Sequence, residues 1–165
     1  MCPQPPRDFA YIPNPDRPWV ESPSMSSTDC LNINISVPTP PSTESAGTPL
    51  YPVMVFVHGG AFVYGAGSAP IYDGRKLAQI SQDLGIPTII VTITYRVGLY
   101  GFLASKEIKE YNQEFNEGGV GNYGLWDQIE ALRWIQEHIS AFGGNPARVT
   151  FFGQSAGGGK YATRL

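Results

Sequence analysis

A chain of 165 residues with 42% hydrophobic content is long enough to bury one core, which excludes a largely disordered protein. The net charge of −3 arises from 11 basic and 14 acidic residues that form no basic stripe, so nucleic-acid binding is excluded as well. The apolar runs are too short to span a bilayer, and the N-terminus lacks the pattern of a signal peptide. We therefore expect no membrane span, and the localisation stays open.

The first two predicted strands differ in their apolar pattern. Residues Leu31–Val37 alternate strictly between apolar and polar side chains, which is typical of a strand with one solvated face. A Pro/Ser/Thr-rich surface connection follows. Residues 51–57 form an apolar run without alternation, which indicates a strand buried on both faces that ends at Gly59-Gly60.

A helix and a third strand come next. The helix is predicted to begin after Asp73 as N-cap and to end at Gly85, with apolar residues on one face at Leu77, Ile80 and Leu84. Residues 87–96 then form another buried strand. Strand, helix and strand in this order predict a right-handed parallel unit of an α/β sheet.

The charged segment 104–119 is predicted as either a short surface helix or an excursion over the sheet. The strongest helical pattern covers 124–138. Its apolar residues lie at steps of four, three, three and four: Leu125, Ile129, Leu132, Ile135 and Ile139. The last predicted strand is Val149–Phe152.

A serine between glycines directly follows this strand, in Gly153-Gln154-Ser155-Ala156-Gly157. A nucleophilic serine needs a tight, strained strand-to-helix turn that exposes its hydroxyl, and flanking glycines relieve the crowding there. An ordinary Ser/Gly-rich loop after a strand is the alternative.

The earlier run "VHGGAF" complements the serine turn. Attack on an ester carbonyl produces an oxyanion, and glycine-rich backbone at a strand end can bring amide groups close to it. The alternative is a simple glycine turn. Both features occur in the order expected of an oxyanion loop followed by a nucleophile.

The two cysteines, Cys2 and Cys30, are either unrelated thiols or one disulfide. Seven prolines between them indicate an irregular loop that needs an external tie. A bond closing a loop of about 28 residues would contribute roughly 3–4 kcal/mol, and it implies an oxidising compartment. Such a bond suggests a secreted protein, although the sequence shows no signal peptide. A metal site is not expected.

Four consecutive blocks resemble the type-B carboxylesterases, the family that includes cholinesterases and several fungal lipases. The blocks are "STDCLNINISVP", "PVMVFVHGGAF", "ITYRVGLYGFL" and "GNYGLWDQIEALRWIQEHISAFGGNPARVTFFGQSAGG". The resemblance covers Cys2 to about Gly158. It implies an α/β-hydrolase fold with an incomplete, mostly parallel sheet flanked by helices. Residues 1–165 would be part of one such domain, with 1–30 as a Pro-rich loop closed by a disulfide.

The resemblance also implies roles for individual residues and no cofactor. Ser155 is similar to the family's nucleophile. The oxyanion amides correspond to Gly60, Ala61 and Ala156, with Gly59 permitting the turn.

Outside the catalytic group, the resemblance pairs Cys2 with Cys30 and implies a structural ion pair between Arg96 and Asp127. Three aromatic residues match positions that line or approach the family's pocket, although packing is the alternative for each: Phe62, Tyr64 and Trp126.

Three features depart from the family pattern. Phe151 replaces an aliphatic residue, and Thr28 stands where an acid usually precedes Asp29. The tail "GGGKYATRL" is poor helix material.

The residues after Ser155 contain neither an acid nor a histidine, the two partners that follow the serine in this fold. His58 and His138 are not expected to replace the base. We therefore expect a serine hydrolase of small-molecule or lipid esters that is present as a fragment and inactive alone. The alternatives are a catalytically inactive cholinesterase-like protein-binding module and a truncated product without stable function. A glycosylation sequon lies at Asn34.

Overall fold

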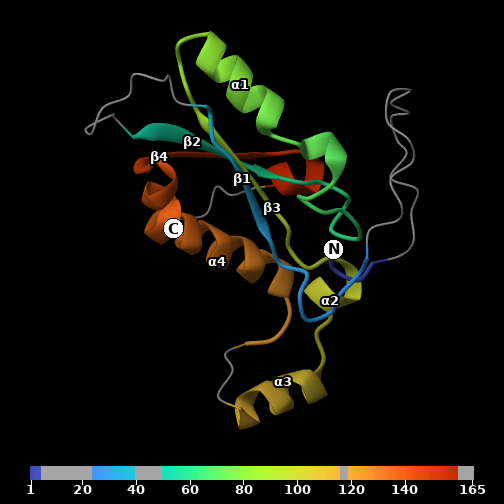
Figure 1. The fold of residues 1–165 in the computed structure, drawn as a ribbon. Helices are drawn as coiled ribbons and strands as arrows, with labels where there is room; N and C mark the ends of the chain where they lie inside the picture. The colour runs from blue at the N-terminus through green and yellow to red at the C-terminus, as the bar shows by residue number, and fades with distance from the viewer. Residues whose placement is uncertain (5–23, 40–49, 116–118, 160–165) are drawn as a thin grey trace.

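A computed structural model describes residues 1–4, 24–39, 50–115 and 119–159. Four of its strands form one sheet, in the order β1-β3-β2-β4 (Figure 1). Their bounds are Ile33–Ser36 for β1, Tyr51–Val57 for β2, Ile89–Ile93 for β3 and Gly144–Gly153 for β4. All four predicted strands are therefore present.

The sheet is mixed and mostly parallel, as predicted. β2 lies in the centre and pairs in parallel with both β3 and β4. β1 pairs antiparallel with β3, so Ile33 lies opposite Ile93. The parallel pairs bring the carboxyl ends of β2 and β4 together, with Val57 opposite Gly153. Both glycine-rich turns of the sequence follow directly from these two strand ends.

Helices cover both faces of the sheet, with α1 on one face and α4 on the other (Figure 1). The helix bounds are Arg75–Asp83 for α1, Gly98–Phe102 for α2, Lys106–Glu114 for α3 and Tyr123–His138 for α4. Single helical turns occur at η1 (Pro70–Tyr72), η2 (Ile139–Phe142) and η3 (Ser155–Gly158). The described residues include no helix that is both long and apolar enough to cross a membrane.

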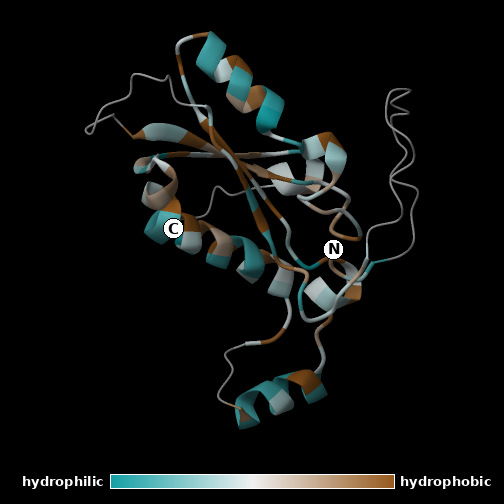
Figure 2. Cartoon of the chain, in the orientation of Figure 1, coloured by the Kyte–Doolittle hydropathy of each residue, from teal (hydrophilic) through white to brown (hydrophobic). Residues whose placement is uncertain are grey.

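The core lies between the sheet and α4. Fully buried valine and isoleucine side chains of β2 and β3 pack there with Tyr95, Ile135 and Ile139. In Figure 2 hydrophobic residues recur along the central strands, and hydrophilic and hydrophobic residues alternate along the helices. The buried apolar run of β2 thus places the end of this strand, and the loop after it, on a rigid support.

The apolar face of α1 is not buried. Leu77, Ile80 and Leu84 are 45%, 41% and 68% exposed, and the small residues Ala78 and Ser81 face the sheet instead. The sequence predicted the correct periodicity, because three apolar residues share a face. Periodicity alone does not say which face packs against the sheet.

The predicted start of this helix is wrong by one residue. Gly74 is the N-cap, and α1 begins at Arg75. Asp73 nevertheless accepts a hydrogen bond from the Arg75 amide at 3.1 Å, so its carboxylate still satisfies a donor of the first turn.

Three other elements differ from the prediction or complete it. α2 was not predicted, because a five-residue helix with two glycines carries no periodic signal. Of the two alternatives for 104–119, the helix is present, and Ser105 caps α3 by accepting a hydrogen bond from the Ile108 amide. β4 extends beyond the predicted Val149–Phe152, since its pairing with β2 continues past an irregularity to Gly144.

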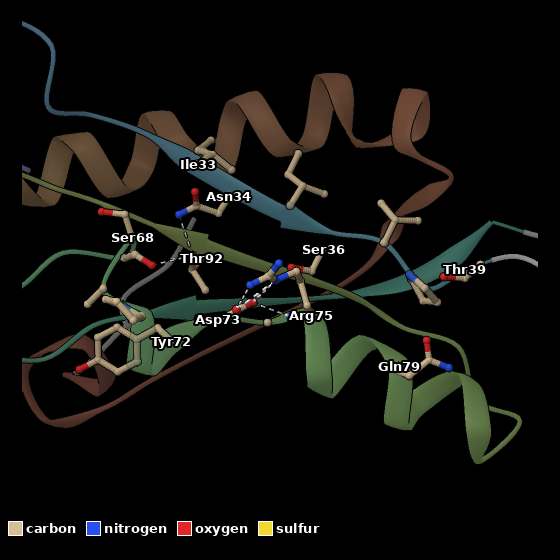
Figure 3. A pocket seen from close by; sticks show the side chains of 17 residues that line it. Ile33, Asn34, Ser36, Thr39, Ser68, Tyr72, Asp73, Arg75, Gln79 and Thr92 are labelled. Atoms are coloured by element: carbon tan, nitrogen blue, oxygen red, sulfur yellow. Dashed lines mark hydrogen bonds and ion pairs between the residues drawn. The ribbon is translucent and has the colours of Figure 1, made fainter. Parts of the chain in front are cut away.

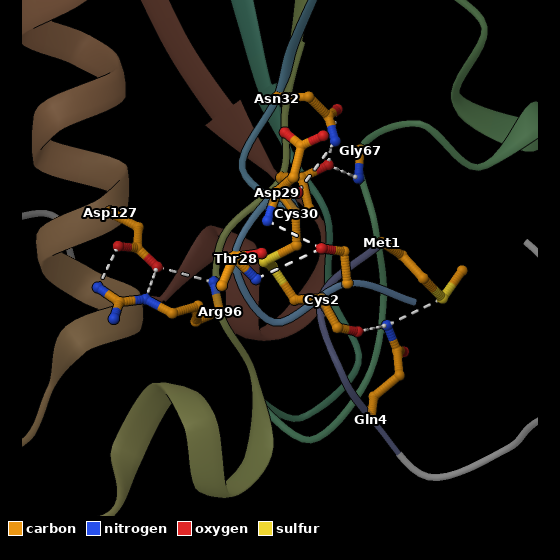
Figure 4. The surroundings of a disulfide bond; sticks show 12 residues. Met1, Cys2, Gln4, Thr28, Asp29, Cys30, Asn32, Gly67, Arg96 and Asp127 are labelled. Atoms are coloured by element: carbon orange, nitrogen blue, oxygen red, sulfur yellow. Dashed lines mark hydrogen bonds and ion pairs between the residues drawn. A yellow bond between two sulfur atoms is a disulfide. The ribbon is translucent and has the colours of Figure 1, made fainter. Parts of the chain in front are cut away.

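The disulfide between Cys2 and Cys30 is present, with a Cα–Cα distance of 4.6 Å (Figure 4). Both cysteines are buried. The bond ties the first four residues to the segment that enters β1. Most of the predicted Pro-rich loop, residues 5–23, lies outside the described residues, as does the end of the tail, 160–165.

Candidate active site

Ser155 lies at a sharp corner where β4 ends and η3 begins. Its backbone has φ of 51°, in the left-handed region that side chains other than glycine rarely adopt. The residue is exposed, so its hydroxyl lies at the surface rather than in the core. These two properties are those that a strand-to-helix turn presenting a nucleophile requires.

The glycines on either side of Ser155 permit this corner. A Cβ atom on Gly157 would lie 2.2 Å from the carbonyl oxygen of Val57 and 2.5 Å from that of His58. A Cβ atom on Gly153 would lie 2.1 Å from the carbonyl oxygen of Gly157. The close approach of the corner to the end of β2 therefore needs glycine, which explains the pattern that the sequence shows around the serine.

The loop after β2 reaches the same corner. A Cβ atom on Gly59 would lie 2.7 Å from the carbonyl oxygen of Gln154 and 3.2 Å from Cβ of Ser155. The Gln154 amide also donates a hydrogen bond to the Val57 carbonyl at 3.2 Å. The two glycine-rich stretches, about a hundred residues apart in sequence, are thus in direct contact.

Backbone amides near this contact are available as donors. No described carbonyl accepts a hydrogen bond from the amides of Gly60, Ala61 or Ala156. Gly60 and Ala61 both have positive φ values, 110° and 54°, so the chain turns sharply just after it passes Ser155. Such a concentration of unpaired amides beside a serine can stabilise a negative charge that forms there.

Among the described side chains, none forms a hydrogen bond with the Ser155 hydroxyl, and the recorded contacts of both histidines are with other residues. The His58 ring is fully buried, and its Nδ1 contacts the Gly59 carbonyl oxygen at 2.8 Å. The His138 ring lies at the end of α4, where it packs against Trp134. A base that activates Ser155 is therefore absent from the described part of the chain.

Burial lowers the pKa of His58 below its ordinary value of 6.5, although the hydrogen bond to Gly59 opposes this shift. Above pH 6.5 the ring is neutral in both the folded and the unfolded chain. Below pH 6.5 the His58 ring binds a proton in the unfolded chain but stays neutral in the folded chain. We therefore expect the free energy of unfolding to decrease as the pH falls below about 6.5, until the folded-state pKa is reached.

Urea denaturation between pH 7.5 and 5 measures this dependence. The His58→Asn variant should show a smaller slope over the range than the unsubstituted chain. Equal slopes for the unsubstituted chain and His58→Asn would contradict a neutral, buried His58.

One contact beside the serine has no signal in the sequence. Tyr72 of η1 donates a hydrogen bond from its hydroxyl to Oε1 of Gln154 at 3.0 Å. Its ring also packs against Phe56, which in turn packs against Phe152. Sequence analysis missed this contact because the partners are 82 residues apart and Tyr72 belongs to no recognisable motif.

Arg96 and Asp127 form an ion pair that joins the end of β3 to the first turns of α4 (Figure 4). Asp127 accepts hydrogen bonds from the Arg96 amide at 2.9 Å, from Nε at 2.8 Å and from the terminal guanidinium nitrogen at 2.6 Å. The Asp127 side chain is 5% exposed and that of Arg96 is 34% exposed. The pair therefore ties the segment after β3 to α4.

The three aromatic residues named from the family resemblance have different surroundings. Phe62 packs against the core and forms an edge-to-face contact with Phe102, at 5.2 Å between ring centroids. Tyr64 is half-buried, and Trp126 is 52% exposed on α4. The packing alternative therefore describes Phe62.

A groove of about 860 Å³ among the described residues does not include Ser155 (Figure 3). Residues of β1, η1 and the start of α1 line it, including Asn34, Tyr72 and the ion pair of Asp73 with Arg75. No group of three or more His, Cys, Asp or Glu side chains in the described ranges could hold a metal ion. The serine corner, and not this groove, therefore carries the candidate chemistry.

Comparison with known proteins identifies relatives of this chain. A sequence profile described as the carboxylesterase family matches residues 1–163. The chain is 44% identical over 165 residues to the para-nitrobenzyl esterase of Bacillus subtilis (strain 168), and it covers 29% of that protein. It is 43% identical over 132 residues to the fumonisin B1 esterase of Sphingopyxis macrogoltabida. That match covers 80% of this chain and 22% of the relative.

A cholinesterase of Mus musculus is 40% identical over 139 residues, which cover 84% of this chain and 20% of that protein. Among solved structures, a "thermophylic PNB esterase" superposes with a TM-score of 0.71 at 42% identity. That superposition covers 95% of this chain and 27% of the other. These structural neighbours confirm the predicted α/β-hydrolase fold. The chain spans less than a third of the length of each relative.

Proposed function

Because this chain belongs to the carboxylesterase family, we propose that it carries the nucleophile and the oxyanion donors of a serine ester hydrolase. The observation that supports this proposal is the contact between the two glycine-rich stretches. It brings the exposed Ser155, held at a positive φ, against the loop that begins at Gly59. Acyl transfer needs a nucleophile to attack the carbonyl carbon and hydrogen-bond donors to stabilise the oxyanion, and this contact brings the two together.

In the proposed reaction, the Ser155 oxygen attacks the acyl carbon of an ester while a base takes the hydroxyl proton. The resulting oxyanion accepts hydrogen bonds from the amides of Gly60, Ala61 and Ala156. The tetrahedral intermediate collapses, the alcohol leaves with the proton from the base, and an acyl-enzyme remains. Water then repeats the same steps and releases the carboxylic acid.

The base and the acid that orients it are proposed to come from residues outside the described part of this chain. We use "complete catalytic unit" for this chain together with the segment that supplies both groups. Within that unit, residues 1–165 form part of one domain, and residues 1–30 form a loop closed by the disulfide. The substrate is proposed to be a small-molecule or lipid ester, and the names of the relatives support an ester.

An assay of the isolated 165-residue chain tests whether the base lies outside this chain. We expect no burst of p-nitrophenol from p-nitrophenyl butyrate, because an unassisted serine hydroxyl stays protonated and is a poor nucleophile. The complete catalytic unit, assayed at the same concentration, should turn the ester over. A stoichiometric burst from the monomeric isolated chain that disappears in Ser155→Ala would show that the base lies within residues 1–165.

A further inference from the structure

We infer that His58 is a positioning residue for ester hydrolysis, because its ring holds the peptide that carries the first oxyanion amide, that of Gly60. This inference rests on the proposed function of Ser155. It adds a side chain to a group of donors otherwise made from backbone. His58 follows the last residue of β2, so the rigid centre of the sheet sets its place.

Two contacts fix the His58 ring, and a third fixes its backbone. It stacks on Tyr95 with 4.3 Å between ring centroids and 10° between planes. The Tyr95 hydroxyl donates a hydrogen bond to the His58 carbonyl at 3.0 Å. Nδ1 lies 2.8 Å from the Gly59 carbonyl oxygen, and the side chain is fully buried. A ring held in this way can fix its neighbour's carbonyl.

The contact with Gly59 defines which nitrogen carries the proton. A carbonyl oxygen can only accept, so Nδ1 of His58 must bear the hydrogen and donate it. Nε2 is buried, and no described group pairs with it. A doubly protonated ring would leave an N–H at Nε2 without a described acceptor, which is costly in the interior. His58 is therefore a neutral ring with the donor at Nδ1.

Fixing the Gly59 carbonyl also fixes the Gly60 amide. The two groups belong to one planar trans peptide, in which C=O and N–H point in opposite directions. Both residues are glycines, so side-chain sterics do little to prevent this peptide from rotating. The hydrogen bond from His58 supplies the restraint, and Gly59 itself lies against Ser155.

The next peptide shows the same arrangement made from backbone alone. The Gly60 carbonyl accepts hydrogen bonds from the amides of Val63 at 2.9 Å and Tyr64 at 3.2 Å. These bonds hold the peptide that carries the Ala61 amide. The His58 side chain therefore restrains the Gly60 amide in the same way that a backbone turn restrains the Ala61 amide.

A second contact shields the hydrogen bond from His58. A Cβ atom on Gly65 would lie 2.2 Å from Nδ1 of His58 and 2.7 Å from the Gly59 oxygen, so the Gly65 backbone packs directly on this bond. The Gln4 side chain holds Gly65 in place, because its amide donates to the Gly65 carbonyl at 3.1 Å and accepts from the Gly65 amide at 2.7 Å. A shielded, desolvated hydrogen bond restrains more firmly than a solvated one.

The test uses variants of His58 in the complete catalytic unit, with active sites titrated by an alkyl fluorophosphonate. His58→Phe keeps a ring for stacking on Tyr95 but removes the donor. We expect kcat per titrated site to fall about 10- to 100-fold, somewhat less than the loss on deleting a donor outright, with KM changed less than about threefold. Binding of an alkyl trifluoromethyl ketone, whose adduct with Ser155 is an oxyanion, should weaken in parallel.

Two further variants separate the effect of the hydrogen bond to Gly59 from the effect of side-chain shape. They also test the role of His58 if His58→Phe does not fold. The side-chain amide of His58→Asn can donate from near the Nδ1 position, whereas that of His58→Gln places its nitrogen near Nε2. We expect kcat of His58→Asn to exceed that of His58→Gln by about tenfold. Only the asparagine can still donate a hydrogen bond to the Gly59 carbonyl and so restrain the Gly60 amide. The matched control is His138→Asn, the same substitution at the exposed histidine at the end of α4, and its kcat per site should stay within about twofold.

The inference is overturned if His58→Phe keeps kcat per site within twofold, or if His58→Asn and His58→Gln have equal kcat values. A failure of the proposed function gives a different result. In that case the unsubstituted unit hydrolyses no ester, or Ser155→Ala retains the full rate.

Discussion

Replacing Ser155 by alanine in the complete catalytic unit lowers kcat for p-nitrophenyl butyrate by about 10⁵- to 10⁶-fold. The substitution removes the proposed nucleophilic oxygen, whereas the proposed oxyanion amides stay in place. A small residual rate over water is expected from those amides and from substrate binding. Because the residue is exposed at the corner, its hydroxyl contributes little to packing, so the variant should unfold at nearly the temperature of the unsubstituted unit.

Ser140→Ala is the matched control for this experiment. Ser140 is an exposed serine of η2, away from the corner, and its removal should leave kcat unchanged. Mass spectrometry after treatment with a fluorophosphonate should place one adduct on Ser155 in both the unsubstituted unit and Ser140→Ala. An adduct on a different residue, or hydrolysis by Ser155→Ala above one percent of the original rate, would refute the assignment of the nucleophile.

Replacing Asp127 by alanine should lower the free energy of unfolding by about 3 kcal/mol. The carboxylate is nearly buried and accepts three hydrogen bonds from Arg96. Its loss leaves a guanidinium and a backbone amide without their acceptor. The exposed part of Arg96 regains water, and for this reason we expect less than the full cost of a completely buried unpaired charge.

Glu130→Ala, three residues later on the same helix, is the matched control. Glu130 pairs with Arg133, and both side chains are more than 60% exposed. Exposed pairs on a helix contribute little, so we expect a change within about 0.5 kcal/mol. Urea denaturation compares the two variants through their midpoints at a constant m-value. If Asp127→Ala and Glu130→Ala shift the midpoint equally, the buried pair does not anchor α4.

The elements that the sequence predicts well are those whose signal is local. The apolar runs of β2 and β3 identify buried strands, and the periodicity of α4 identifies a long helix, because burial on two faces or on one stripe leaves a direct pattern. α2 and the first half of β4 escape prediction because tertiary contacts form them. A Cβ atom on Gly124 of α4 would lie 3.0 Å from ring atoms of Phe102 in α2, so α2 depends on close packing that a propensity does not contain.

The candidate site shows the same division. The motif around Ser155 and the run that begins at His58 were both recognised from sequence. The surroundings of His58 were not, since Tyr95, Gly65 and Gln4 reach the ring from segments that no sequence pattern links. The exposed face of α1 illustrates the limit for packing. The sequence predicts the periodicity of this helix. Which of its faces packs against the sheet depends on the assembled fold.

The tight backbone contacts at the corner also constrain how such an enzyme can evolve. At Gly59 and Gly157 only a hydrogen atom fits between neighbouring main-chain atoms, so even the smallest added side chain would disturb the meeting of loop and nucleophile. Under the proposed function, a change in ester preference must therefore come from side chains that surround the corner and not from the glycines that form it.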